Sequence, residues 1–165
     1  LNVVKYILSE EGVKSFIVKK ILDVLNNRLA YYLQKMDANC LCSFNELFEE
    51  KIINEKGENC SYFNFSGAER KNIDLAILFT FMDMRRLQGE VAYNIVIFDE
   101  LLDSSLDEKG VELVLSLLNE RVEEYKENIY IISHRKESAK AATGEVITLQ
   151  KQNGITTRVD FVDEN

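Results

Sequence analysis

Apolar residues recur along the chain with different periods, and each period predicts a different kind of element. From residue 18 to residue 36 the apolar positions are separated by 4, 3, 4, 3 and 4 residues: Val18, Leu22, Leu25, Leu29, Tyr32 and Met36. This spacing is the seam of a coiled coil or of a long helix packed along a neighbour. Both alternatives predict a helix within residues 1–36.

Two later stretches have the same helical period. Their apolar faces are Ile73, Ala76, Ile77, Thr80, Met84 and Leu87 in one, and Val111, Val114, Leu115, Leu118, Val122 and Tyr125 in the other. Short runs rich in Ile and Val, at residues 93–98 and 128–133, have the near-continuous apolar character of parallel strands covered on both faces. The alternation of helices and strands predicts an α/β architecture with a buried parallel sheet.

Turn residues predict two β-hairpins. Glu55-Lys56-Gly57-Glu58 separates strand-like residues 48–53 from residues 60–65. Asn153-Gly154 separates two alternating runs, residues 145–150 and 155–162, and Asn-Gly is the strongest short-range hairpin signal.

Composition narrows the class of protein. With 165 residues, 46% of them hydrophobic, the chain can build a core of its own, and 20 basic against 28 acidic residues argue against a uniformly basic, nucleic-acid-binding surface. Only residues 1–36, with six basic and three acidic side chains, have a charge that favours DNA. The apolar stretches are too short and too often interrupted by charge to span a membrane.

The cysteines indicate the redox compartment of the protein, and the first residue and the lack of proline bear on whether the chain is part of a longer polypeptide. Cys40, Cys42 and Cys60 are odd in number with no histidine nearby, which argues against a disulfide framework or zinc site and favours a reducing, cytoplasmic compartment. We interpret Cys40 and Cys42 as small, semi-buried side chains on a strand. Because the chain begins at Leu1 and has no proline, we expect it to be part of a longer polypeptide.

Candidate chemistry begins at Asp99 and Glu100, which follow the apolar strand directly. The carboxyl edge of a parallel sheet is where ligands of such folds bind, and a carboxylate there can hold a metal ion. Neighbouring side chains of an extended backbone point in opposite directions, so one carboxylate would hold Mg²⁺ through water while the other would act on a nucleophilic water. A solvated strand end is the alternative.

Two further positions stand at element ends. Ser66 and Glu69 form a capping-box pattern at the start of a long helix, and Gly67 inside that first turn costs helix stability unless the backbone must approach a ligand. A helix N-terminus attracts phosphate, although an ordinary helix start explains Ser66 and Glu69 equally. His134, the one histidine of the chain, ends the second strand, where a histidine without a role is also common.

In this order and spacing the motifs resemble the ABC-type ATPase head shared by structural-maintenance-of-chromosomes (SMC) proteins and their DNA-repair relatives. Residues 65–71, Phe-Ser-Gly-Ala-Glu-Arg-Lys, resemble the signature motif, and residues 95–100 resemble Walker B. Ser105-Leu106-Asp107 resembles the D-loop, and His134 the switch histidine. The resemblance covers about residues 60–150. The most similar branch is the ATPase subunit of recombination and double-strand-break repair nucleases, especially its phage form.

The resemblance implies a fold and a set of roles. The fold would be the C-terminal lobe of a P-loop, ABC-type head, a mostly parallel sheet flanked by helices, with residues 1–36 descending from a coiled coil and residues 37–165 forming a lobe that ends in a β-hairpin. Asp99 would hold Mg²⁺ through water, Glu100 would be the general base, and His134 would sense the γ-phosphate of ATP. The implied cofactor-binding residues are Ser66, Gly67, Ala68, Glu69, Ser105 and Asp107. Of these, Ser66 and Gly67 would contact the γ-phosphate of ATP held by the opposite head, while Ser105 and Asp107 would couple the two sites.

The sequence departs from the family pattern at three points. Ala68 replaces the second glycine of the signature, and the loop from Glu100 to Asp107 is one residue longer than usual, with Leu101 in place of proline. None of the seven glycines is followed by lysine, so the chain has no G-x-x-x-x-G-K-[ST] phosphate loop. We therefore expect that this chain cannot build a complete ATP site by itself.

The resemblance also implies a set of partners. They are the N-terminal lobe of the same polypeptide, a second copy of the head, a metallophosphoesterase-type nuclease subunit and DNA, with no membrane. ATP binding would clamp two heads together and hydrolysis would release them, which would regulate the nuclease. Two alternatives stay open: an SMC-like DNA clamp or cohesion ATPase without a nuclease, and an ATPase-inactive dimerisation module, for which Ala68 is the best support.

Overall fold

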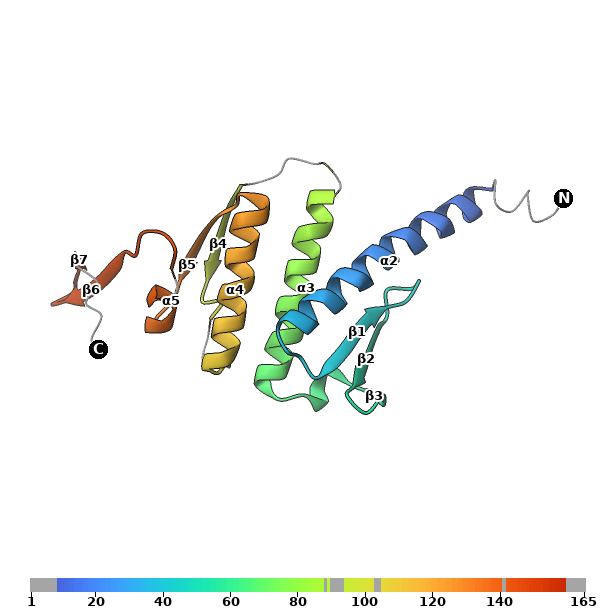
Figure 1. Ribbon diagram of the computed structural model, residues 1–165, viewed down its shortest axis with the longest axis horizontal. Helices are drawn as coiled ribbons and strands as arrows, with labels where there is room; N and C mark the ends of the chain where they lie inside the picture. The colour runs from blue at the N-terminus through green and yellow to red at the C-terminus, as the bar shows by residue number, and fades with distance from the viewer. Residues whose placement is uncertain (1–8, 88, 90–93, 103–104, 141, 160–165) are drawn as a thin grey trace.

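A computed structural model describes residues 9–87, 89, 94–102, 105–140 and 142–159 of the chain (Figure 1). The helices are α2 (Glu10–Lys35), α3 (Gly67–Leu87), α4 (Glu108–Tyr125), α5 (Lys136–Lys140) and the 3₁₀ helix η1 (Tyr62–Asn64). The strands are β1 (Cys40–Phe44), β2 (Glu50–Asn54), β3 (Asn59–Cys60), β4 (Ile95–Asp99), β5 (Asn128–Ile132), β6 (Thr148–Gln152) and β7 (Ile155–Val159). The α/β class predicted from the sequence is confirmed.

Helix α2 is the long helix that the heptad spacing predicts. It begins at the N-cap Ser9, whose hydroxyl accepts a hydrogen bond from the Gly12 N–H at 3.1 Å. In its second half the predicted seam is buried, at Leu22, Leu25, Leu29, Tyr32 and Met36. This half lies against α3, whereas the first half extends away from the rest of the molecule (Figure 1).

Strands β1, β2 and β3 form an antiparallel sheet beside α2, in the order β1-β2-β3. The side chain of Asn26 on α2 joins the two elements, because it accepts from the Phe44 N–H at 2.8 Å and donates to the Phe44 carbonyl at 2.9 Å. The hairpin predicted around Gly57 is present, but its second strand is only Asn59–Cys60. The chain leaves the sheet there because Tyr62–Asn64 turns into a 3₁₀ helix.

Strands β4 and β5 form the predicted parallel pair, with Val96 beside Ile129 and Phe98 beside Ile131. These four side chains face the helices, where Phe98 packs into the core with Phe79 of α3. The other face carries Ile95, Ile97, Tyr130 and Ile132, which are 57%, 65%, 59% and 54% exposed. The prediction that both faces are covered is therefore wrong for the described part of the chain, because α3 and α4 lie on one side of the pair only (Figure 1).

The C-terminal hairpin, β6 and β7, is antiparallel, and the predicted Asn-Gly turn connects its strands. Asn153 and Gly154 both have positive φ, 52° and 83°, as a two-residue hairpin turn with the right-handed strand twist requires. Residues 160–162, which the sequence also assigns to this hairpin, lie outside the described residues. Among the described helices, none is long and apolar enough to cross a membrane.

Candidate functional site

The candidate site lies where β4 and β5 end. Asp99 is the last residue of β4, exposed, and in register with Ile132 of β5. Glu100 follows with a left-handed backbone (φ 52°), a conformation that costs a non-glycine residue about 1–2 kcal/mol. Its N–H donates to the Ile132 carbonyl at 3.0 Å, which fixes this bend against the end of β5. The bend separates the two carboxylates, as their different predicted roles require.

The structure brings Glu100 together with His134. The Nε2 atom of His134 lies 3.5 Å from the Oε1 atom of Glu100, and both side chains are largely exposed. The next residue, Arg135, donates from Nη1 to the Leu106 carbonyl at 2.8 Å, which ties the segment after β5 to the loop after β4. Two residues that the sequence proposes separately as catalytic are thus neighbours at one sheet edge.

The predicted capping box at the start of α3 is present. The Ser66 N–H donates to Glu69 Oε2 at 2.8 Å, and the Glu69 N–H donates to Ser66 Oγ at 3.3 Å. The hydroxyl and the backbone N–H of Ser66 lower the pKa of the Glu69 carboxyl. A Cβ added at Gly67 would meet nothing within 4 Å, so nothing in the described part of the chain requires a glycine there. The turn is exposed, with Ala68 half-buried.

The Ser66–Glu69 turn and the Glu100–His134 pair are not in contact. Figure 1 shows the start of α3 at the same end of the molecule as the carboxyl ends of β4 and β5. No interaction joins them among the described residues, so the structure does not bring Ser66, Gly67 or Glu69 to the same site as Glu100 within one chain.

The loop after Glu100 leads into α4. Leu101, Leu102 and Leu106 are buried and anchor it, while residues 103 and 104 lie outside the described residues. Asp107 is the N-cap of α4, and its Oδ1 accepts from the Gly110 N–H at 2.7 Å. Ser105 is half-buried beside it. Within this chain, therefore, the carboxylate of Asp107 has a structural task at the helix start.

The sequence analysis does not indicate a buried ionic network that lies near the ends of α3 and α4, just before β5 begins. Arg121 of α4, 2% exposed, donates to Asp83 of α3 at 2.6 Å, to Tyr32 of α2 at 2.9 Å and to Glu127 at 3.0 Å. Tyr32 in turn donates to Asp83 at 2.7 Å, and burial together with this bond raises the pKa of the Tyr32 hydroxyl. The network connects three helices. Its one sequence signal is that Arg121 falls on the apolar face of α4, three residues after Leu118.

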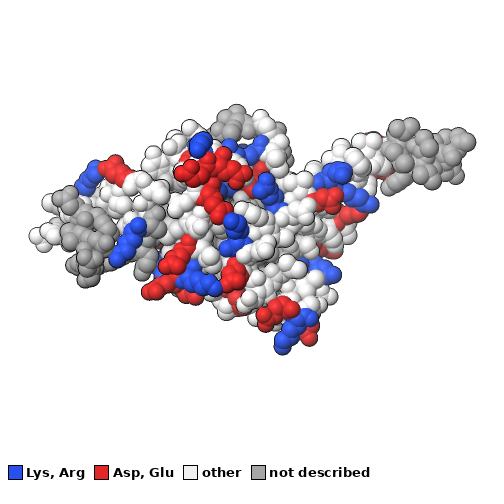
Figure 2. Space-filling view, in the orientation of Figure 1, with Lys and Arg blue, Asp and Glu red and all other residues white. Residues whose placement is uncertain are grey.

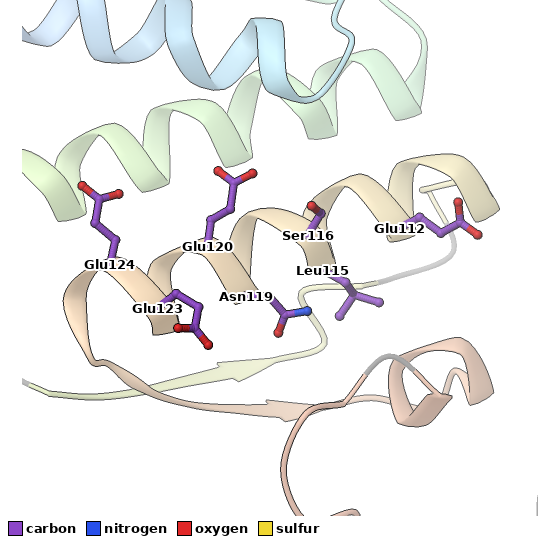
Figure 3. Close-up of a pocket in the computed structure, with 7 residues that line it drawn as sticks. All are labelled: Glu112, Leu115, Ser116, Asn119, Glu120, Glu123 and Glu124. Carbon is purple, nitrogen blue, oxygen red and sulfur yellow. The ribbon is translucent and has the colours of Figure 1, made fainter.

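A groove of about 780 Å³ runs along α4 (Figure 3), and neither Asp99 nor Glu100 lines it. It is lined by Glu112, Leu115, Ser116, Asn119, Glu120, Glu123 and Glu124. Acidic side chains gather over this part of α4 on the molecular surface (Figure 2). Their charge would repel a triphosphate, so the groove is not a candidate nucleotide site.

Asp99 fits a magnesium ion only in combination with other oxygens. Among the described residues, no group of three His, Cys, Asp or Glu side chains could hold a metal ion. Mg²⁺ is usually held by one or two carboxylates, several waters and the phosphates of the substrate, rather than by an all-protein cage. The exposed carboxylate of Asp99 at a strand end agrees with this mode of binding.

No family model matches the chain. It is 34% identical over 140 residues to exonuclease subunit 2 of Escherichia phage RB69 and 32% identical over 152 residues to exonuclease subunit 2 of Enterobacteria phage T4. These matches cover 85% and 92% of the chain but 24% and 26% of the phage proteins, so the chain spans about a quarter of their length. A solved SMC ATPase structure, described for ATP-driven dimerisation and DNA-stimulated activation, aligns at a TM-score of 0.70 and 16% identity, over 88% of each chain.

The chain has the fold of an SMC ATPase head. It is also a relative of the phage exonuclease subunits, which confirms the resemblance derived from its motifs. The residues predicted from the sequence lie at the carboxyl ends of β4 and β5, at the start of α3 and at the start of α4.

Proposed function

We propose that this chain is the C-terminal lobe of an ATPase head, which hydrolyses ATP once a second lobe and a second head complete the site. The observation that carries this proposal is the Glu100–His134 pair at the carboxyl edge of two parallel strands, in a chain with the SMC-head fold. Ligands of open α/β sheets bind outside this edge.

Each residue of the edge has a role in the proposal. ATP bound with Mg²⁺ supplies the phosphoanhydride bond that is broken. Asp99 binds the ion through its water shell, and Glu100 accepts the proton of the attacking water. His134 donates a hydrogen bond from its imidazole toward the γ-phosphate. Such positioning and charge stabilisation is the main contribution that proteins make to phosphoryl transfer.

The second lobe accounts for the open face of β4 and β5. Ile97 and Tyr130, neighbours in register, expose 65% and 59% of their surface there. Parallel sheets occur almost only with both faces covered. Because the sequence also has no phosphate loop, we infer that an N-terminal lobe of the same polypeptide covers this face and supplies the loop.

The second head accounts for the signature turn. Ser66 and Gly67 are exposed and do not contact Glu100 or His134 of their own chain. We infer that their N–H groups and hydroxyl meet the γ-phosphate bound by the opposite head, with Ala68 and Glu69 shaping the turn. Ser105 and Asp107 then connect the two sites across the interface, and ATP binding clamps the heads together.

The relationship to phage exonuclease subunits favours a nuclease partner over a clamp without one. We infer that the nuclease is a separate subunit of the metallophosphoesterase type, and that ATP-driven head closure controls its access to DNA. We place the nuclease chemistry in the partner, because Asp99 and Glu100 lie at the ATP site of the proposed head.

Phosphate release by this chain, alone and mixed with the N-terminal lobe from the same gene, tests the proposal. Activity should appear only in the mixture, disappear with Glu100→Gln, and survive Glu123→Gln, a matched change on the exposed face of α4. No activity in a stable complex of the two lobes would favour an inactive dimerisation module instead.

A further inference from the structure

Phe63 is the most exposed large apolar side chain in the described part of the chain, at 80%. It belongs to the 3₁₀ helix η1, three residues before the signature Ser66. An aromatic ring held in water loses the free energy of burial that such side chains normally gain, about 1.5–3 kcal/mol. Its exposure leaves the ring available to a ligand or partner.

The backbone around Phe63 is fixed by polar contacts on both sides. Ser61 and Asn64 form a capping box, in which the Ser61 N–H donates to Asn64 Oδ1 at 2.8 Å and the Phe63 N–H donates to Ser61 Oγ at 3.4 Å. These reciprocal bonds hold η1 in one conformation. The ring of Phe63 is thus presented outward by its backbone.

The neighbouring ring of Tyr62 is also anchored. Its hydroxyl donates to the carboxylate of Asp74 at 2.9 and 3.0 Å, and the guanidinium of Arg70 lies 5.9 Å from its ring centre. Phe63 packs edge-to-face on this ring, with centroids 5.5 Å apart and planes at 85°. One aromatic ring thus supports the other, and the faces of Phe63 remain largely open to solvent.

Phe63 lies close enough to the signature turn for one nucleotide to reach both. Three residues span at most about 10 Å, so the ring lies within one triphosphate-ribose length of the N–H groups at the start of α3. A nucleotide whose γ-phosphate met Ser66 could therefore place its base over Phe63. Stacking needs only an open aromatic face of this kind.

We propose that Phe63 stacks on the purine base of the ATP whose γ-phosphate meets the Ser66 turn, and so makes ATP-driven head engagement sensitive to the base. The inference rests on the proposed function, because it requires a nucleotide bound by the opposite head. It adds a specificity-determining residue to the phosphate contacts of Ser66 and Gly67.

The experiment measures the ligand concentration that gives half-maximal head engagement, in the full-length polypeptide with Glu100→Gln to prevent turnover. The ligands are ATP and ribose 5′-triphosphate, which lacks the base. Phe63→Ala should raise the value for ATP by about 5- to 150-fold, the range for loss of a base–aromatic stack, and leave the value for ribose triphosphate unchanged. Phe63→Trp should restore the ATP value. Phe48→Ala, which removes an exposed Phe from the β1–β2 turn, is the matched control and should change neither value.

The outcomes distinguish failure of base stacking by Phe63 from failure of the proposed ATPase function. Equal losses for both ligands with Phe63→Ala would show that the ring packs on the opposite head and would overturn base stacking. Unchanged values for both ligands would also overturn it. If the heads of the parent protein do not dimerise when ATP is added, the proposed function itself fails, and this inference fails with it.

Discussion

The Nε2 atom of His134 lies 3.5 Å from the Oε1 atom of Glu100, across the ends of two adjacent parallel strands. The contact depends on the register of β4 and β5, in which Asp99 is opposite Ile132, and on the left-handed backbone of Glu100. The bend removes Glu100 from the line of the strand that Asp99 continues. In the proposed function, Asp99 would bind the metal ion and Glu100 would act on the water molecule.

Glu100→Gln should separate nucleotide binding from hydrolysis. The amide keeps the shape of the side chain but cannot accept a proton, so we expect ATP turnover to fall about 10²-fold or more. ATP-dependent dimers of the head should then persist, because the step that releases them is blocked. Phosphate release and size-exclusion chromatography with ATP measure the two effects. Unchanged turnover would remove Glu100 from the role of base.

His134→Ala should reduce turnover while nucleotide affinity is largely kept. The imidazole is 91% exposed beside Glu100, so its loss leaves no buried cavity and should not disturb the fold. His134→Gln retains a donor and should recover part of the rate. Equilibrium binding of ATP, measured beside steady-state hydrolysis, separates the two parameters. A collapse of affinity with unchanged turnover per bound nucleotide would contradict the proposed contact with the γ-phosphate.

Ser66→Arg should prevent head engagement. A long cationic side chain at the first turn of α3 occupies the space that the opposite nucleotide needs, and it removes the hydroxyl that accepts from the Glu69 N–H. Ser116→Arg adds the same charge on the exposed face of α4 and serves as the control. Sedimentation with and without ATP reports the monomer–dimer equilibrium. Normal ATP-dependent dimerisation of Ser66→Arg would argue against binding in trans.

Local patterns predict the elements of this chain well, because periodicity and turn chemistry act over few residues. The seam from Leu22 to Met36 gives the packed half of α2, and Asn153-Gly154 gives the C-terminal turn. The length of β3 is harder to predict from the sequence. The capping box of Ser61 and Asn64 forms a 3₁₀ helix directly after Cys60, and this ends the strand early. Hydrogen bonds from side chains to the nearby backbone compete with strand pairing, and the spacing of apolar residues does not predict them.

Two features of the site could not be derived from pattern alone. Residues 95–98 are apolar throughout, so the sequence gives no sign that Ile97 is exposed while Phe98 is buried. The neighbourhood of Glu100 and His134 requires the strand register, and the sequence suggests it only through the resemblance to SMC heads. Arg121 is a charged residue on the apolar face of α4. Its partners lie on other parts of the chain, so the local pattern does not predict its ion pairs.

Arg121→Met should destabilise the fold by about 2 kcal/mol or more. The change removes the guanidinium that the buried carboxylates of Asp83 and Glu127 share, and the loss of a partner from a buried charged group costs about 1–3 kcal/mol or more. Arg86, 3.0 Å from Glu127, and Arg28, 3.7 Å from Asp83, keep part of the compensating charge. Lys35→Met breaks the exposed pair with Glu120 and should cost no more than about 1 kcal/mol. Urea unfolding of both variants gives the comparison. Equal losses would show that the network of Arg121 contributes no more than a surface pair.

The buried thiols of β1 should make stability fall at high pH. Burial raises the pKa of Cys40 and of Cys42 from 9.0 to about 11, so between these values the folded protein retains protons that the unfolded chain releases. Each thiol then lowers the free energy of unfolding by up to about 1.4 kcal/mol per pH unit in that window, and contributes no slope below it. Urea titrations from pH 7.5 to 10.5 under reducing conditions should show a smaller loss for the double variant Cys40→Ala/Cys42→Ala than for the parent. Leu41→Ala, an exposed change on the same strand, should keep the parent slope. A double variant that loses stability as steeply as the parent would assign the alkaline effect to other groups, such as the buried hydroxyl of Tyr32.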